Sequence, residues 1–195
     1  MKKNLFLFFL LVAGFTGFGQ SWSKQYDRVD GFNDDRALVA KNGKFGFCCE
    51  KGTVWVKLVY DDAAAFSEGR AAVKVGDKWG FVDKFGNEIV KPQYWDVYSF
   101  HDGLAVVSIG GLCGYIDTTG KLAITMQYIN ALAFGDGVAP VCNEKGLWGY
   151  IDKTGKEVIG FKYNFAAAFS DGSGKVVYKN KWYNISKEGK LTATE

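Results

Sequence analysis

Few residues in this sequence could perform catalysis or bind a metal ion. His101 is the only histidine among the 195 residues, and it lies in the segment Phe100-His101-Asp102-Gly103. No Gly-x-Ser-x-Gly segment offers His101 a serine nucleophile, and no Cys-x-x-Cys or His-x-x-x-His spacing offers a metal its ligands. We therefore predict no catalytic residue, no metal site and no cofactor.

The four cysteines are a second possible source of chemistry. They are Cys48, Cys49, Cys113 and Cys142. Cys48 and Cys113 occupy positions at which other parts of the chain carry core residues, so we expect buried free thiols. If the protein is exported and a disulfide forms, Cys113 and Cys142 are the favoured pair.

Carboxylates could in principle form the acid–base pair of a glycosidase. The candidates are Asp61, Asp62, Glu68 and Asp83. Each stands at a turn position that recurs along the chain, where a structural role accounts for it. We therefore do not expect hydrolase activity.

The segment from Tyr94 to His101 is the candidate ligand-binding site. Trp95 offers a flat ring on which a sugar could stack, and Tyr98 and His101 could add polar contacts. The alternative is that Trp95 folds back onto its neighbours in a tolerant loop. We predict Trp95, Tyr98 and His101 as ligand-binding residues.

An internal repeat must position these residues. Tyr26, Tyr60, Tyr94 and Tyr128 are spaced 34 residues apart, and Tyr163 follows 35 later. A fixed period of this length indicates a repeat architecture. The units are residues 26–59, 60–93, 94–127, 128–162 and 163–195. Trp95 breaks the pattern, because Asp61 stands at its place in the preceding unit.

Each unit is predicted to hold three strands, which in the second unit are 70–75, 78–83 and 88–91. Gly76-Asp77 is a two-residue hairpin loop, which pairs Val75 with Lys78 and Ala71 with Val82. One face then carries Ala71, Val73, Gly80 and Val82, and the other carries Ala72, Lys74, Trp79 and Phe81. Because neither face is plainly polar, each sheet needs a neighbour on both sides.

The predicted fold is therefore all-β, with five three-stranded meanders in a propeller-like or toroidal array; an open superhelical stack is the alternative. Trp79, Trp148 and Trp182 are expected in the core, and Gly80 is expected to admit an aromatic side chain from the adjoining sheet. Residues 20–25 align with 88–93, which predicts an N-terminal half-repeat strand with Trp22 at the place of Val90.

Two motifs resemble those of the WG (KWG) β-repeat family. The first is Lys78-Trp79-Gly80-Phe81-Val82-Asp83, with a second copy at 147–152. The other is Phe-x-[Asp/Glu]-Gly, found at 66–69, 100–103, 134–137 and 169–172. The unit pattern is broken at Phe45-Gly46, at Cys113-Gly114 and at Trp182-Tyr183, the last in a unit expected to be an atypical cap. The resemblance implies a repeat scaffold of bacterial surface or envelope proteins without enzyme activity.

The N-terminus has the layout of a cleaved signal peptide spanning residues 1–19. Lys2 and Lys3 precede an apolar run from Leu5 to Ala13, and small residues stand just before Gln20. The formal net charge of +3 gives no reason to expect nucleic-acid binding, and no membrane-spanning segment is expected after the leader. We expect a periplasmic or extracellular binding module. Its partner is expected to be a protein, with carbohydrate or cell-wall glycan as the alternative.

Overall fold

The computed structural model describes residues 21–193, which form a short helix and five antiparallel sheets. The 3-10 helix η1 (Ser21–Gln25) is followed by the first sheet, β1 (Arg28–Asn33), β2 (Arg36–Lys41), β3 (Lys44–Cys48) and β4 (Val54–Tyr60). The second sheet is β5 (Asp62–Ala63), β6 (Arg70–Val75), β7 (Lys78–Asp83) and β8 (Glu88–Tyr94). The third is β9 (Asp96–Val97), β10 (Leu104–Ile109), β11 (Leu112–Asp117) and β12 (Leu122–Tyr128). The fourth is β13 (Asn130–Ala131), β14 (Val138–Cys142), β15 (Trp148–Asp152) and β16 (Glu157–Tyr163). The fifth is β17 (Phe165–Ala166), β18 (Gly174–Tyr178), β19 (Lys181–Ile185) and β20 (Leu191–Ala193).

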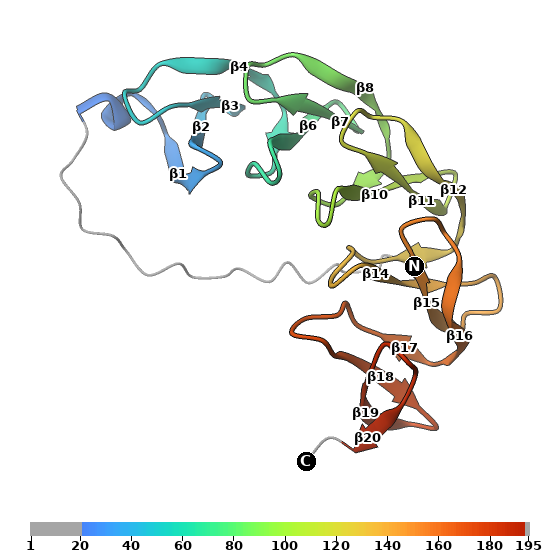
Figure 1. Ribbon diagram of the computed structural model, residues 1–195. Coiled ribbons are helices and arrows are strands. Elements are labelled where there is room, and N and C mark those ends of the chain that lie inside the picture. Colours follow the sequence, from blue (N-terminus) through green and yellow to red (C-terminus); the bar gives the residue numbers. More distant parts are fainter. Residues whose placement is uncertain (1–20, 194–195) are drawn as a thin grey trace.

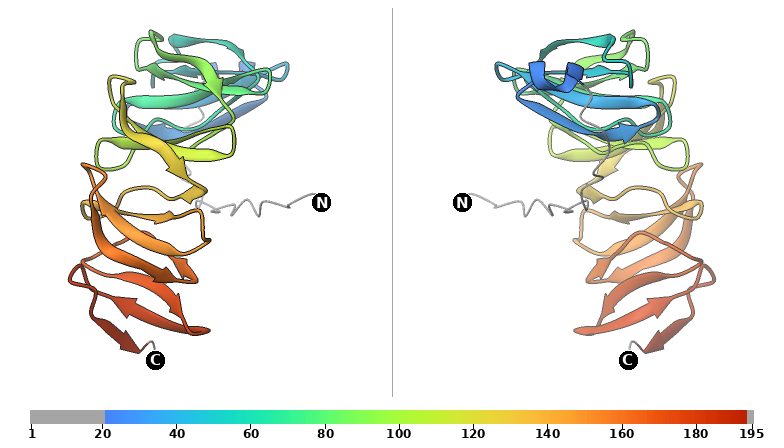
Figure 2. Two further views of the ribbon diagram at one scale, coloured as in Figure 1. Left: turned by 90° about the vertical axis from the view of Figure 1, so that its right-hand side faces the viewer. Right: turned by 90° about the vertical axis from the view of Figure 1, so that its left-hand side faces the viewer.

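The sheets follow one another like propeller blades along an open arc (Figure 1). The predicted propeller-like arrangement is thereby confirmed. β1 and β20 lie near opposite ends of the arc, and β4, β8, β12 and β16 form its outer rim. Seen from the side, the third, fourth and fifth sheets follow one another in chain order, while the first two overlap in the view (Figure 2). The predicted signal peptide, residues 1–19, lies outside the described residues.

Each sheet has four strands, so the prediction of three was wrong. The additional strand is the first one, which is six residues long in the first sheet and two in each of the others; in the second sheet it pairs Asp62 with Lys74 and Ala63 with Val73. It comes from the connection between units and occupies one edge of its sheet. Trp95 directly precedes the equivalent strand β9.

The predicted hairpin register is confirmed. In the second sheet Val75 pairs with Lys78 and Ala71 pairs with Val82. Gly76 has a φ of 58°, as a tight two-residue loop needs. The same register recurs in the third sheet, where Ser108 pairs with Cys113 and Ile109 with Leu112.

The glycine of the WG motif has a different role from the predicted one. The pairing of β7 with β8 shifts register between Trp79 and Phe81, which marks a β-bulge. A Cβ added at Gly80 would collide with the backbone of Val90 and Lys91 on the neighbouring strand. Gly80 therefore accommodates the bulge of its own sheet rather than an aromatic ring from the next one.

Adjacent sheets pack their apolar faces against one another, which makes a core at each of four junctions. At the first junction, Leu38 and Phe47 of the first sheet lie in one cluster with Val73 of the second. Aromatic pairs recur along the arc at each junction: Phe47 with Phe66, Phe81 with Phe100, Tyr115 with Phe134, and Tyr150 with Phe169. The third junction lies between the third and fourth sheets, and the fourth lies between the fourth and fifth.

Hydrogen bonds also tie each unit to the next. The acidic residue of the Phe-x-[Asp/Glu]-Gly motif has a positive φ and accepts a backbone N–H from the following unit. Asp102, for example, accepts the N–H of Gly137 at 2.7 Å. Glu68 and Asp136 accept the equivalent bonds from Gly103 and Gly172, and Asp34, at the same place in the first unit but followed by Asp35 instead of glycine, accepts the N–H of Gly69.

The two ends of the arc are capped by different means. Ser21–Gln25, within the predicted strand at 20–25, form the 3-10 helix η1 and do not join the first sheet, whose four strands are β1 to β4. Trp22 nevertheless packs as its alignment with Val90 predicts. The Trp22 ring lies against Gly52 of the first unit, and Val90 lies against Gly120, the equivalent glycine of the third unit. Asn184 of the fifth unit stands at the position of Phe81, which is fully buried in the second unit. The outer face of the fifth sheet is therefore more polar than the same face of the second sheet.

Candidate functional site

The residue before the motif glycine faces the next sheet near the hairpin turn. This position holds Phe45, Trp79, Cys113 and Trp148 in the first four units; the aligned residue of the fifth unit is Trp182, which precedes Tyr183 in place of the glycine. Four units therefore place a large ring there, and only the third places a small side chain. Of the three tryptophans predicted in the core, only Trp148 is buried; Trp79 is half-buried, and Trp182 at the end of the arc is 51% exposed.

At the second and fourth junctions this position is filled by an indole. Trp79 lies beneath the ammonium group of Lys74, whose Nζ is 5.7 Å from the ring centroid. Trp148 is 7% exposed, and its ring centroid lies 5.5 Å from that of Phe165. Both junctions are thereby closed by side chains of the protein itself.

The third junction instead holds a cavity of about 390 Å³. Cys113 and its cross-strand partner Ser108 stand where the second unit has Trp79 and Lys74. Two small side chains replace two large ones, and the backbone of the sheets keeps the space open. The lining consists of Asp96, Val97, Tyr98, Val106, Ser108, Gly111, Cys113, Ile129 and Asn130. Its volume falls within the range of small-ligand pockets.

Short edge strands bring the polar groups to this cavity. Asp96 lies on β9 of the third sheet, and Asn130 lies on β13 of the fourth. The Asp96 N–H donates to Ser108 Oγ at 3.1 Å, and Ser108 Oγ lies 3.5 Å from Asp96 Oδ2. Asn130 Oδ1 accepts the N–H of Ala131 at 2.8 Å.

The electrostatic character of the cavity is negative. Asp96 is its only charged lining residue. Burial raises the pKa of the Cys113 thiol, and the nearby Asp96 carboxylate raises it further. The pKa of Tyr98 is raised by burial, then by Cys113 and Asp96. Both groups are therefore protonated at neutral pH and can donate a hydrogen bond, and Asp96 supplies a charged acceptor beside the apolar surface.

The structure separates the three residues predicted as a ligand site. Tyr98 lines the cavity and is 44% exposed, whereas Trp95 and His101 are not among the lining residues. Trp95 is 52% exposed, and Lys78 Nζ lies 2.9 Å from its ring centroid, so a lysine covers one face of the ring. His101 is exposed and forms an isolated β-bridge with Leu104.

Sequence reasoning missed Asp96, Ser108, Cys113 and Asn130 as parts of a site. The available signal was Cys113, which departs from the aromatic residue of the other units. All four cysteines are free, so the Cys113–Cys142 pair is not a disulfide in this structure; Cys48 and Cys142 are buried, while Cys49 and Cys113 are partly accessible.

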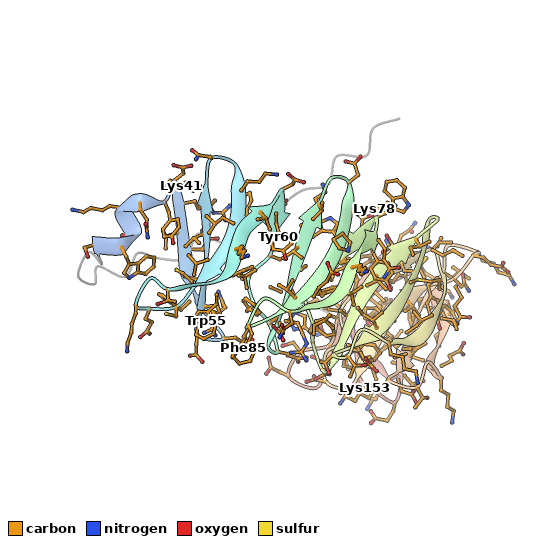
Figure 3. All side chains as sticks on the ribbon, turned by 90° about the horizontal axis from the view of Figure 1, so that it is seen from above. Lys41, Trp55, Tyr60, Lys78, Phe85 and Lys153 are labelled. Atoms are coloured by element: carbon orange, nitrogen blue, oxygen red, sulfur yellow. The ribbon has the colours of Figure 1, made fainter. Side chains whose placement is uncertain are left out.

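A second group of exposed aromatic residues lies on the other side of the arc. Trp55 is 43% exposed and Phe85 is 64% exposed, with ring centroids 5.8 Å apart. The Arg36 guanidinium carbon lies 5.1 Å from the centroid of the Trp55 ring. Figure 3 shows Trp55 and Phe85 together on one side of the sheets, opposite Lys41 and Lys78 at the hairpin turns.

The chain belongs to the WG containing repeat family, whose repeat matches residues 23–45, 45–79, 79–113, 114–146 and 148–182. No curated protein shows significant similarity to it. Within residues 21–193, no helix is both long and apolar enough to cross a bilayer.

Solved structures share the fold at low sequence identity. A eukaryotic initiation factor structure has a TM-score of 0.56 at 10% identity, covering 87% of this chain and 55% of that one. Kluyveromyces lactis Hsv2 has a TM-score of 0.54 at 13% identity, covering 84% and 63%. The computationally designed protein Ika8 has a TM-score of 0.52 at 16% identity, covering 86% and 61%. The chain thus spans less than two thirds of these proteins, and the likeness establishes a propeller-like β-repeat fold.

Proposed function

We propose that this protein is an exported, non-enzymatic scaffold that binds a protein partner through the cavity at the third junction. The supporting observation is a single local difference between repeated units. Cys113 opens a pocket where the second and fourth units close the same position with an indole. Because loops and edge strands on a rigid scaffold commonly carry binding function, this departure from the repeat is the strongest candidate contact.

The proposal of export rests on the N-terminal sequence alone. A basic start, an apolar run and small residues before Gln20 form the pattern of a cleaved leader. We propose a periplasmic or extracellular location in the bacterial envelope. N-terminal mass spectrometry of the exported protein should find a chain beginning near Gln20, and an intact Met1 would contradict export by this route.

A carbohydrate partner is the second candidate function. Trp95, Trp55 and Phe85 are exposed aromatic residues of the kind on which sugar rings stack. A glycan array would test this candidate with wild type, Trp95→Ala and Trp55→Ala. Binding that is lost in one of the variants would assign the ring, and no binding by wild type would reject the glycan partner.

The protein-partner proposal is tested by affinity capture from envelope extracts with two forms of the tagged protein. The Cys113→Trp variant carries the residue that three other units hold at the same place, so it closes the cavity without a foreign side chain. We expect wild type to retain a partner that Cys113→Trp releases. A partner kept equally by both forms would place the contact elsewhere on the arc. Capture of no partner by wild type would reject the proposal.

A further inference from the structure

We propose that the cavity at the third junction is a receptor for an indole ring, supplied by a tryptophan side chain of a partner protein. This inference rests on the proposed function, because it assumes that the partner is a protein. It names the chemical group that the partner presents and the residues that hold it.

The first argument comes from the volume and its origin. At the fourth junction the Trp148 indole is 7% exposed, packed against Phe165. At the third junction the equivalent residues are Cys113 and Asn130, and both line the open cavity. The space left between the sheets is therefore the space that an indole occupies one unit further along.

The second argument comes from the shape and polarity of the lining. Val97, Val106 and Ile129 supply apolar walls, and Tyr98 adds an aromatic ring. A flat ring buries more surface between such walls than a flexible aliphatic chain does, and it loses less conformational freedom on binding. An anionic group is disfavoured, because Asp96 is the only charged lining residue.

The third argument comes from the hydrogen-bonding capacity of Asp96. Its carboxylate has one weak hydrogen bond, from Ser108 Oγ at 3.5 Å, and Asp96 is exposed at the edge of the cavity. A carboxylate accepts hydrogen bonds only, so it has capacity for an N–H donor. The indole of tryptophan has one N–H, which it donates. An indole with its N–H directed to Asp96 packs its ring against the apolar walls and gives the carboxylate a hydrogen-bond donor.

The tryptophans of this chain do not fill the cavity, since none of the six is among its lining residues. Trp95 is adjacent to Asp96 in sequence, but its ring lies against Lys78. The missing ring must therefore come from another molecule, and a protein presents indoles as tryptophan side chains.

The test is a titration of the isotope-labelled protein, observed by NMR, with N-acetyl-L-tryptophanamide as the probe. We expect weak binding, on the order of millimolar, as is usual for a ligand of this size, with the largest shifts at the amides of Asp96, Tyr98 and Cys113. Cys113→Trp should abolish these shifts while its spectrum remains that of a folded protein. Trp95→Ala is the matched control outside the cavity and should bind as wild type does.

The role of Asp96 is tested with Asp96→Asn and a probe methylated at the indole nitrogen. We expect about tenfold weaker binding of the unmethylated probe by Asp96→Asn, because the indole N–H then donates to a neutral amide oxygen instead of a charged carboxylate. The methylated probe should bind wild type and Asp96→Asn equally. Equal binding of the unmethylated probe by wild type and Cys113→Trp would overturn the proposal. Tighter binding of N-acetyl-L-lysinamide would replace the indole with a cationic side chain.

The outcomes separate this inference from the broader proposal. If the probe does not enter the cavity, but wild type still captures a partner that Cys113→Trp releases, the indole assignment fails and the protein-binding function stands. If the probe binds in the cavity and no partner is captured, the ring preference of the pocket stands and the protein partner is rejected.

Discussion

The third and fourth junctions have nearly the same hydrogen-bonded framework but differ in what fills the space near the hairpin turn. Tyr115 and Tyr150 occupy equivalent places, and each is fully buried with its hydroxyl donating to a carbonyl of the next unit at 2.8 Å. Trp148 and Phe165 close the fourth junction, whereas Cys113 and Asn130 leave the third open.

The comparison shows how a repeat protein can gain a pocket without a change of fold. The main-chain pairing within the sheets and the hydrogen bond from a buried tyrosine to the next unit recur at both junctions. The side chains at the positions of Cys113 and Asn130 then decide whether the remaining space is core or cavity.

Trp148→Cys should produce the largest effect, because it introduces the open arrangement at the closed junction. A buried indole is removed, and we expect a loss of about 3–5 kcal/mol in the free energy of unfolding. Urea melts measure it. A loss below about 1 kcal/mol would mean that Trp148 contributes little to the core.

Cys113→Trp is the reverse change and should stabilise the protein. Filling a cavity with the side chain that the framework already accommodates in other units is expected to add about 0.5–2 kcal/mol. The same urea melts give the result. A clear destabilisation would indicate that the third junction is too narrow for an indole, which would also count against the proposed receptor site.

Tyr115→Phe and Tyr150→Phe should destabilise the protein by similar amounts, about 1 kcal/mol each, because each removes one buried hydrogen bond. Tyr163→Phe is the control, since its buried hydroxyl has no hydrogen-bond partner among residues 21–193. That variant should be neutral or slightly stabilising in thermal melts. Unequal losses for Tyr115 and Tyr150 would show that the two frameworks differ.

Thiol labelling should distinguish the open junction from the closed sheets. Cys49 should react fastest with iodoacetamide, because the N–H of Lys51 lowers its pKa and so raises its thiolate fraction at a given pH. Cys113 should follow, slowed by its raised pKa but reachable through the cavity, and its rate should rise with pH. Cys48, with a pKa of about 11, and buried Cys142 should be slowest. Mass spectrometry of the digested protein gives this order, and labelling of Cys142 before Cys113 would contradict an open third junction.

Trp95→Ala should have the smallest effect. The ring is 52% exposed and lies outside the cavity, so we expect a loss below about 0.5 kcal/mol in urea melts. A loss comparable to that of Trp148→Cys would show that Trp95 supports the neighbouring junction through Lys78.

The repeat, the hairpin register and the two apolar faces could be predicted from the sequence because they depend on local signals. Gly76 lies in a two-residue loop that sets the pairing of β6 with β7, and the alternation of side chains along a strand then assigns each one to a face. The atypical final unit was predictable for the same reason, since Tyr183 and Asn184 are visible departures from a repeated pattern.

The fourth strand and the cavity depended on contacts between residues far apart in the chain. β5 is only Asp62–Ala63, too short for any periodic pattern, and it forms because β6 offers an unpaired edge. From the sequence alone, Cys113 is interpreted as an ordinary core residue. It lines a cavity because Asp96 and Asn130 come from edge strands on either side of the junction and because the two sheets keep the same backbone arrangement whether or not an indole fills it.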